Sequence, residues 1–315
     1  MGRRLLPLVL VLVACSGSQA GVSTTAPPVT VTSTVTTTSV PAPDATLGDT
    51  PSASTTTTLA QPVEEILYEH WRGSFQFRDG LRIDVHAPEV RSNHPIAVMV
   101  HGGGWFGGRL DSMGHLADGL AAQGFVVFNA SYRTLTQGGA FPSMVEDVAC
   151  AVAYARDHAL DFSTTADHLT LIGYSAGAHL ASLVAFSPAT FGTACEGGDV
   201  PVDAFVGLAG SYDTDVYAFL LQPFYGTAFS VDPEPWRAGN PFTYVSDIDP
   251  DLEILLIHGD MDEVVPTAMS ENLFLAVEQS GASASLHVIT AASHTEVNSP
   301  RLVSELIAAF VNGDQ

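Results

Sequence analysis

The sequence predicts an α/β domain over residues 63–315, with a mostly parallel central sheet flanked by helices. Short apolar runs that are typical of buried parallel strands alternate along this region with amphipathic runs that are typical of helices. One of the apolar runs leads through a G-x-S-x-G turn directly into a helical pattern. The region has roughly 250 residues, which is enough for one sizeable hydrophobic core.

The expected elements can be placed in order along the chain. Strand-like runs at 69–79 and 81–87 flank Asp79-Gly80, a dipeptide that suits a tight hairpin turn. Further strands are expected at 96–100, 125–130, 169–172, 202–208, 253–257 and 285–289. Helices are expected at 116–123, 142–158, 178–186, 267–279 and 301–311.

The N-terminal segment is typical of an exported protein. Residues 1–14 pair Arg3 and Arg4 with a short apolar run, the pattern of a secretory signal peptide. The following Leu-Val-Ala-Cys resembles the lipobox of bacterial lipoproteins, in which the cysteine, here Cys15, is lipidated and becomes the first residue. The alternative is an ordinary secreted protein cleaved near Ala20. The lipobox favours a location on the outer face of a bacterial membrane.

Residues 15–62 are expected to be a tether that begins with the lipidated cysteine. Positions 16–62 contain fourteen Thr, seven Ser and six Pro, and their only charged residues are Asp44 and Asp49. Such a composition cannot bury a core and is typical of an extended or disordered spacer. The chain would then contact the membrane through its lipid anchor only.

Composition excludes several classes of function. The formal net charge is −23, or −25 once Arg3 and Arg4 leave with a signal peptide, so nucleic acid and anionic membrane surfaces are poor partners. All eleven basic residues are arginine. The absence of lysine excludes a Ser–Lys dyad, Schiff-base chemistry and P-loop phosphate binding. No Cys or His spacing resembles a zinc site, and the HExxH motif is absent.

The G-x-S-x-G turn is GYSAG at 173–177, and it places Ser175 between a strand and a helix. A serine hydroxyl is a weak nucleophile unless it is exposed beside a base and near backbone N–H donors. Gly173 and Gly177 lack the Cβ atoms that would collide at such a sharp turn. We therefore predict Ser175 as the nucleophile and the N–H of Ala176 as an oxyanion donor.

A second glycine-rich segment, HGGGW at 101–105, follows the strand expected at 96–100. Consecutive glycines allow backbone N–H groups to approach a substrate oxygen, as an oxyanion hole requires. A phosphate loop would need the G-x-G-x-x-G spacing, which is absent. We predict the N–H groups of Gly103 and Gly104 as oxyanion donors, with His101 and Trp105 as structural supports.

Residues for a general base and its acid follow the last two predicted strands. Asp260 and Asp262 both come just after the strand at 253–257. Asp260 follows a glycine and is expected to make a turn hydrogen bond, so Asp262 is the predicted acid. His294 lies in a loop that can reach the serine, whereas His287 lies inside a strand and is the weaker candidate for the base. His258 is expected to be a structural histidine at a strand end.

Three further features have structural predictions. Arg133 is expected to pair with an acid such as Asp147, although contact with a substrate carboxylate is the alternative. Cys150 and Cys195 remain after Cys15 is assigned, and either a disulfide or two buried thiols is compatible with the sequence. Residues 212–244 hold nine of the 27 aromatic residues. This density favours a segment that caps a pocket, and plain packing under a long loop is the alternative.

With these residues in place, the chain resembles an α/β-hydrolase. More narrowly, it is similar to the HGGGW esterases related to hormone-sensitive lipase and to the bacterial feruloyl and acetyl-xylan esterase-like group. The resemblance is carried by HGGGW at 101–105, GYSAG at 173–177, HGDMDEVVP at 258–266 and SHTE at 293–296. Members often have Gly-His where this chain has Ser293-His294. The resemblance implies a catalytic domain over 63–315 with nucleophile Ser175, acid Asp262 and base His294.

The function that this resemblance implies is hydrolysis of carboxylic esters with short or medium acyl or aryl groups, through an acyl-enzyme and without a metal or cofactor. The expected substrate is a small-molecule or polysaccharide-linked ester. An amidase of the same fold, such as an arylformamidase-like enzyme, is the alternative, because the same triad cleaves amides. A non-catalytic surface binding module is disfavoured, since every part of the triad is present. The sequence leaves the oligomeric state open.

Overall fold

The computed structural model describes residues 69–195 and 201–313. The expected signal peptide at 1–14 and the expected lipidated Cys15 and tether at 15–62 lie outside these residues, as do the first six residues of the expected catalytic domain. Among the helices in the described ranges, none combines the length and the apolar character needed to cross a membrane.

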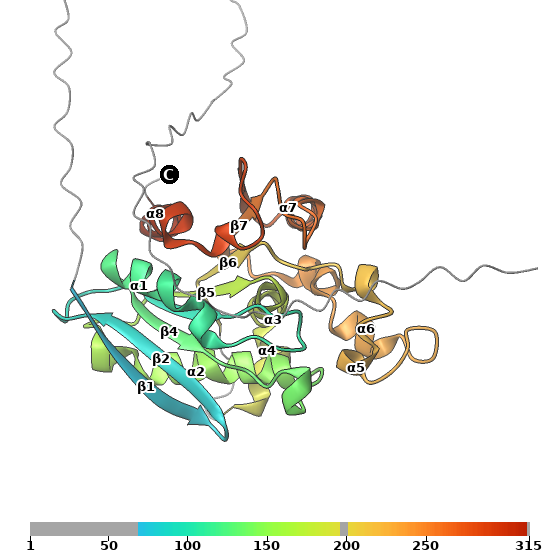
Figure 1. The fold of residues 1–315 in the computed structure, drawn as a ribbon, viewed down its shortest axis with the longest axis horizontal. Helices are drawn as coiled ribbons and strands as arrows, with labels where there is room; N and C mark the ends of the chain where they lie inside the picture. Colours follow the sequence, from blue (N-terminus) through green and yellow to red (C-terminus); the bar gives the residue numbers. More distant parts are fainter. Residues whose placement is uncertain (1–68, 196–200, 314–315) are drawn as a thin grey trace, which may run out of the picture. The chain divides into compact units, whose positions relative to one another are not determined.

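Within the described residues, eight strands form one mixed sheet in the order β1-β2-β4-β3-β5-β6-β7-β8 (Figure 1). β1 and β2 form an antiparallel hairpin and β2 pairs antiparallel with β4, whereas all other pairs are parallel. The strand bounds are β1 His70–Arg78, β2 Leu81–Pro88, β3 Ile96–Val100, β4 Val126–Ala130, β5 Leu169–Tyr174, β6 Ala204–Leu208, β7 Glu253–Gly259 and β8 Ala284–Ile289.

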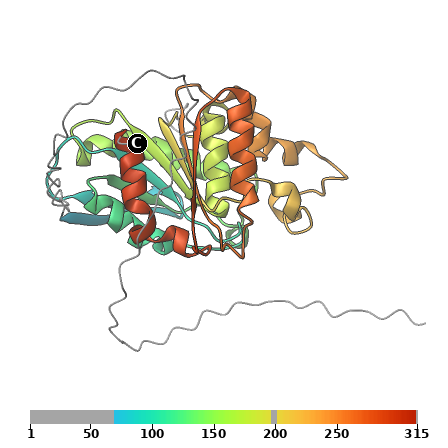
Figure 2. The ribbon, with the colours of Figure 1, turned by 90° about the horizontal axis from the view of Figure 1, so that it is seen from above.

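Helices cover both faces of the sheet, and each face has its own hydrophobic core. α1 and α8 pack on one face, and α2, α3 and α7 pack on the other (Figure 2). The α-helices are α1 Gly114–Ala122, α2 Ser143–Phe162, α3 Ala176–Phe186, α4 Pro188–Phe191, α5 Gln222–Tyr225, α6 Glu234–Ala238, α7 Ala268–Ser280 and α8 Pro300–Asn312. Short 3-10 turns are η1 Leu110–Met113, η2 Leu135–Gln137, η3 Gly192–Ala194, η4 Thr214–Tyr217, η5 Pro241–Asp247 and η6 Glu296–Asn298.

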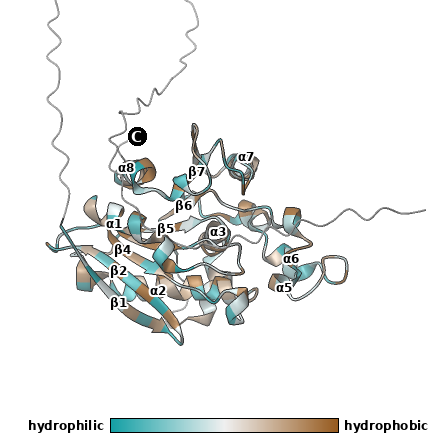
Figure 3. Cartoon of the chain, in the orientation of Figure 1, coloured by the Kyte–Doolittle hydropathy of each residue, from teal (hydrophilic) through white to brown (hydrophobic). Residues whose placement is uncertain are grey.

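The hydropathy of each strand follows from its place in the sheet. Every residue of β3 and of β5 is buried, as expected for central parallel strands that are covered on both faces. The outer strand β1 has no fully buried residue, and β2 begins with alternating apolar and polar positions (Figure 3). The helix α8 shows a hydrophobic side and a hydrophilic side, because only one side faces the core.

The strand register brings the predicted motifs to one edge of the sheet. Val100, the last residue of β3, is paired with Gly173, and Tyr174, the last residue of β5, is paired with Leu208 of β6. Loops that follow parallel strands meet at the carboxyl edge, where α/β sheets usually bind ligands. The HGGGW loop after β3 therefore lies beside the GYSAG turn after β5.

The predicted elements agree with the structure to within a few residues at most ends. The strand 96–100 is found with the same bounds, and the hairpin turns at Asp79-Gly80 as expected. Several predictions were too short, including that of β5, which continues to Tyr174. α2 continues to Phe162, four residues beyond the expected end, and β7 continues through His258 and Gly259. The longer β7 means that His258 is part of the sheet.

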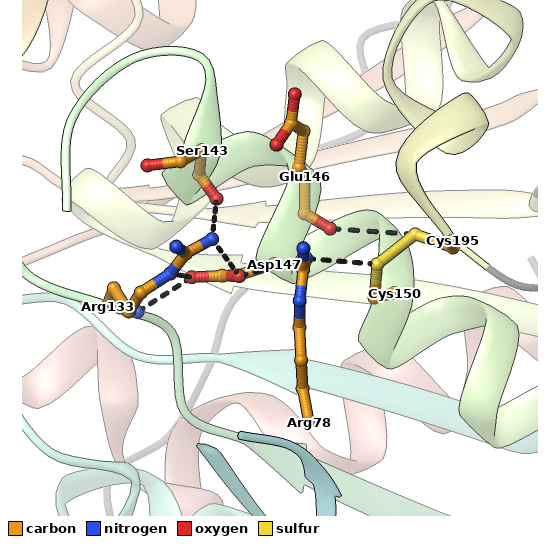
Figure 4. The surroundings of a disulfide bond; sticks show 7 residues. All are labelled: Arg78, Arg133, Ser143, Glu146, Asp147, Cys150 and Cys195. Carbon is orange, nitrogen blue, oxygen red and sulfur yellow. Dashed lines mark hydrogen bonds and ion pairs between the residues drawn. A yellow bond between two sulfur atoms is a disulfide. The ribbon is translucent and has the colours of Figure 1, made fainter. Parts of the chain in front are cut away.

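Cys150 of α2 and Cys195 form a disulfide, which settles the alternative that the sequence left open (Figure 4). The bridge lies beside a cluster of charges around Asp147, whose side chain is buried. Asp147 accepts two hydrogen bonds from the Arg133 guanidinium at 2.7 Å, and Arg78 Nη1 lies 3.1 Å from Asp147 Oδ1 and 3.2 Å from Cys150 Sγ. The expected Arg133–Asp147 pair is thus confirmed. The disulfide and the ion pairs together connect α2 with β1 and with the segment after η3.

Removing the disulfide is expected to destabilise the domain without unfolding it. The bridge spans a sequence separation of 45 residues, for which loop-closure entropy gives a stabilisation of up to about 4 kcal/mol. We predict that Cys150→Ser combined with Cys195→Ser lowers the free energy of unfolding by about 2–4 kcal/mol in urea titrations. Dithiothreitol should destabilise the wild type by the same amount as the double substitution does, and it should leave the stability of the double variant unchanged. If the reductant changed the stability of both proteins by the same amount, the prediction would be contradicted.

Candidate active site

Ser175 occupies a strained turn between β5 and α3. Its φ of 55° and ψ of −122° lie outside the regions that L-residues normally adopt. The close packing of this turn requires glycine on both sides: a Cβ on Gly173 would lie 2.4 Å from the Ala178 Cα, and one on Gly177 would lie 2.4 Å from the carbonyl oxygens of Val100 and His101. These contacts are the collisions that the sequence predicts for this turn.

The structure brings Ser175, His294 and Asp262 together from three different loops. Ser175 Oγ lies 3.0 Å from His294 Nε2, and His294 Nδ1 lies 2.7 Å from Asp262 Oδ2. The carboxylate can only accept at this distance, so Nδ1 carries the ring proton and Nε2 is free to accept the Ser175 proton. His294 is therefore in the tautomer that a general base requires.

Asp262 has a donor for each of its oxygens, although its side chain is fully buried. Oδ1 accepts from the backbone N–H groups of Val264 and Val265 at 2.9 and 2.8 Å. Oδ2 accepts from His294 and also lies 3.1 Å from Nε2 of His258. Four donors hold this carboxylate in one orientation, which stabilises its charge and fixes the direction in which it faces the base.

His258 is a supporting residue whose role the sequence reasoning did not identify. Its Nε2 faces the oxygens of Asp262 and Val265, at 3.1 and 3.0 Å, so this nitrogen must be the donor. Its Nδ1 therefore accepts from the Ser270 hydroxyl at 2.8 Å. Burial lowers the pKa of His258, so the imidazole stays neutral while it donates to the acid. The position is structural, as expected, but the residue that it supports is the predicted acid.

The rejected candidates lie elsewhere. Asp260 is exposed and accepts from the backbone N–H of Ala291 at 2.6 Å, a contact with the loop after β8 instead of the local turn hydrogen bond that was expected. His287 is exposed on β8.

Tyr174, which the sequence did not single out, packs beside the His294 ring and donates its hydroxyl to the His294 carbonyl oxygen at 3.1 Å. It therefore anchors the loop that carries His294.

The predicted oxyanion donors lie next to Ser175. Gly103 and Gly104 line the same cavity as Ser175 and His294, and both have positive φ angles, of 129° and 60°. Ala176 is fully buried and is the first residue of α3, where a backbone N–H has no partner inside the helix. The HGGGW loop and the first residue of α3 thus both adjoin Ser175, which is compatible with the predicted role of these three N–H groups.

Side chains beneath this loop support its shape. Trp105 donates its Nε1–H to Nδ1 of His179 at 3.1 Å, and His179 Nε2 donates to the Gly239 carbonyl oxygen at 2.8 Å. Complete burial lowers the pKa of His179 to about 4, which keeps it neutral. The His101 ring stacks on Tyr132 at 4.4 Å. His101 and Trp105 are thus supports, as predicted, and Trp105 in addition lines the cavity.

The cavity over Ser175 has a volume of about 570 Å³ and a predominantly apolar lining. Part of the aromatic insert covers it, because Tyr217, Leu220 and Leu221 lie in its wall. Tyr212, Phe224, Tyr225 and Trp236 are instead buried in the core. The insert is therefore a cap only between η4 and α5, while these four aromatic residues pack as the alternative interpretation expected, and Phe229 is 46% exposed.

A strand-to-helix turn that carries a serine, followed in the chain by an acid after β7 and a histidine after β8, on a mostly parallel eight-stranded sheet, defines an α/β-hydrolase. A family model agrees with this class and identifies the family. The BD-FAE model matches residues 83–277, and the chain belongs to the BD-FAE family.

Individual relatives support the same class. A probable isoprenylcysteine alpha-carbonyl methylesterase of Oryza sativa subsp. japonica is 28% identical over 232 residues, which cover 69% of this chain and 54% of that protein. Esterase LipC of Mycobacterium tuberculosis is 31% identical over 191 residues, which cover 56% and 47%. The chain thus spans about half the length of these relatives. A solved carbohydrate esterase from gut microbiota, in truncated form, has a TM-score of 0.66 and 19% identity, covering 80% of this chain and 99% of that chain; this likeness shows the fold.

The support that His258 gives to Asp262 has a measurable consequence. We predict that His258→Leu lowers kcat for the reaction of this site by about 10-fold or more with little change in KM, because one hydrogen bond to a buried charge is worth about 1.5–3 kcal/mol. His258→Gln retains an amide donor and should recover most of the rate. His287→Leu, on the exposed face of β8, is the matched control. A kcat within twofold of wild type in a folded His258→Leu variant would contradict the prediction.

Proposed function

We propose that this chain is a serine hydrolase that cleaves carboxylic esters through an acyl-enzyme. The observation that carries the proposal is the Ser175–His294–Asp262 arrangement, with hydrogen-bond distances of 3.0 and 2.7 Å, at the floor of an apolar cavity. The names of the relatives, which include a methylesterase and an esterase, support the same reaction class.

The mechanism follows from the proton positions. His294 Nε2 takes the proton of Ser175 Oγ as that oxygen attacks the ester carbonyl carbon. The imidazolium that forms is stabilised by Asp262 and then gives its proton to the departing alcohol. Water, activated by the same imidazole, attacks the acyl-enzyme, and Ser175 leaves with its proton restored. These side chains and water account for every proton transfer of the reaction.

The negative charge of each tetrahedral intermediate forms on the carbonyl oxygen. Gly103, Gly104 and Ala176 are the proposed N–H donors to that oxygen, since two line the cavity and the third begins α3. Donors that are fixed before the reaction do not have to reorganise as the charge develops, and each contributes about 3–4 kcal/mol to transition-state stabilisation.

The cavity indicates an uncharged acyl or aryl group. Within the described residues its wall holds no Asp, Glu or Arg, and its apolar members include Phe106, Leu220, Leu221, Val264 and Val265. A charged group there would lose its hydration without gaining a partner. We therefore propose small-molecule or carbohydrate-linked esters with short or medium acyl groups; the similarity in fold to a carbohydrate esterase is compatible with the second.

The test is hydrolysis of p-nitrophenyl esters from acetate to palmitate, by wild type and by Ser175→Ala. We expect activity that is highest on short or medium chains and that falls by about 10⁴-fold or more in the variant. Ser211→Ala is the matched control, because Ser211 lines the same cavity but is not bonded to His294. Hydrolysis of p-nitroanilides in place of esters would support the amidase alternative, and equal rates in wild type and Ser175→Ala would overturn the proposal.

We also propose that the protein is a lipoprotein of the outer face of a bacterial membrane. The proposal rests on the apolar run of residues 1–14, the Leu-Val-Ala-Cys lipobox and the Thr-rich tether that follows. Several acyl chains on Cys15 would give strong membrane binding, at about 0.8 kcal/mol per buried methylene group.

Anchoring can be tested on the full chain expressed in a bacterium. The wild type should partition into the detergent phase of a Triton X-114 extract and carry acyl mass on Cys15. Cys15→Ser should partition into the aqueous phase, while a Ser16→Ala control should behave as the wild type. Recovery of unacylated wild type from the aqueous phase would refute the anchor.

A further inference from the structure

A second cluster of ligand-type side chains lies outside the proposed active site. It consists of His70 on β1, His86 on β2 and Asp118 on α1, whose potential ligand atoms all lie within 4.8 Å of one another. None of the three lines the cavity that holds Ser175. The residues come from three elements, with 32 and 48 positions between Asp118 and the two histidines, so no motif spacing in the sequence reveals them.

The strand register explains why the histidines meet. His70 is paired with Pro88 and Arg72 with His86, so His70 and His86 are diagonal neighbours on the same face of the β1–β2 hairpin. Their rings are stacked with centroids 6.5 Å apart. α1 packs over this face and places Asp118 against both rings, with Oδ1 3.1 Å from His70 Nε2 and 2.8 Å from His86 Nδ1.

We propose that His70 Nε2, His86 Nδ1 and Asp118 Oδ1 form a binding site for Zn²⁺, with water completing a tetrahedron. Two imidazole nitrogens and one carboxylate oxygen suit zinc, whereas Ca²⁺ and Mg²⁺ prefer oxygen ligands. Ligands that bind at about 2.0–2.1 Å in a tetrahedron are roughly 3.3 Å apart. The two observed separations from Asp118, 3.1 and 2.8 Å, need only a small expansion to admit the ion.

The surroundings of the cluster fit a metal site in two respects. First, Arg72 Nη2 lies 2.6 Å from Asp118 Oδ2, so the guanidinium holds the second carboxylate oxygen and turns Oδ1 toward the histidines. Metal-binding carboxylates are commonly held in this way by a neighbouring donor. Second, His86 and Asp118 line a cavity of about 480 Å³, and the Asp118 side chain is 23% exposed, which gives an ion access to the site.

Binding of the ion requires only local proton and charge changes. Without metal, His70 and His86 donate ring protons to Asp118; with metal, a neutral imidazole carries its proton on the other ring nitrogen, so no proton need leave the protein. The charge of Arg72 opposes the cation. Arg72 Nη2 lies 2.6 Å from Asp118 Oδ2 and 3.5 Å from His70 Nε2, so the guanidinium must move away from the His70 ring when the ion binds; its side chain is 59% exposed, which permits that movement, and the chain as a whole has a net charge of −23.

The consequence for the fold is a link between the outer hairpin and the body of the domain. β1 is at the end of the sheet, and among the described strands it pairs only with β2. An ion bound by residues of β1, β2 and α1 would fix the hairpin to the helix and stabilise the folded state by mass action. The proposal does not depend on the ester hydrolase activity, since it uses none of the same residues.

The test is a calorimetric titration with Zn²⁺ of the protein purified without a polyhistidine tag. We expect one Zn²⁺ per chain, binding at least 10-fold weaker in His70→Gln and in Asp118→Asn, and no binding of Ca²⁺ at the same concentrations. His158→Gln is the matched control, because His158 also pairs with an aspartate, Asp161 at 3.0 Å, but is not part of a three-ligand cluster. At 100-fold excess over the dissociation constant, Zn²⁺ should raise Tm by about 5–10 °C in wild type and in this control only.

Two results would overturn the proposal. The first is the absence of Zn²⁺ binding to wild type at 100-fold the protein concentration, in which case the cluster is an ion-pair network that only joins the hairpin to α1. The second is wild-type affinity in His70→Gln, which would place any bound ion elsewhere. His70 is partly exposed on an outer strand, so its variant remains informative if Asp118→Asn does not fold.

Discussion

The close approach of the β5–α3 turn to the end of β3 is the constraint on which the rest of the site depends. Gly177 lies so near the carbonyl oxygens of Val100 and His101 that a single added carbon would lie 2.4 Å from each. This contact places the serine turn directly against the glycine-rich loop, so the nucleophile shares one cavity with Gly103 and Gly104. The strained φ and ψ of Ser175 are maintained by the buried strands on either side.

The second requirement of the site is a buried carboxylate that remains charged and correctly oriented. Asp262 meets it with two backbone N–H groups and two imidazoles, and the second imidazole, His258, is itself fixed by Ser270 of α7. The same principle holds at Asp147, a buried carboxylate that pairs with two arginines beside the disulfide. In both places the polar groups of the core are paired, which is why they can be buried at all.

Much of this arrangement could be predicted from the sequence because its signals are local. Central parallel strands are continuous apolar runs, so β3 was predicted with its observed bounds. The turn chemistry of GYSAG and the order of Ser175, Asp262 and His294 identify residues that the structure brings within hydrogen-bond distance. Asp262 was separated correctly from Asp260, but not for the expected reason: Asp262 itself accepts the local N–H groups of the turn, while Asp260 accepts from Ala291 of another loop.

The sequence did not predict the features that depend on contacts between elements far apart in the chain. Nothing in the residues around His258 shows that its ring turns toward Asp262, since this depends on the additional length of β7 and on Ser270. The pairing of Cys150 with Cys195 depends on how α2 packs beside η3. The aromatic insert has a uniform composition, yet Tyr217 lines the cavity while Tyr212 and Trp236 are buried in the core.

The central claim is that His294 activates Ser175 as a nucleophile, and active-site labelling tests it most directly. A fluorophosphonate should form a covalent bond to Ser175 Oγ with loss of fluoride. The account predicts that peptide mass spectrometry finds the label on the peptide that contains Ser175, and that His294→Ala slows labelling by several orders of magnitude. A folded wild-type protein that is not labelled, or that is labelled equally fast without His294, would contradict the account.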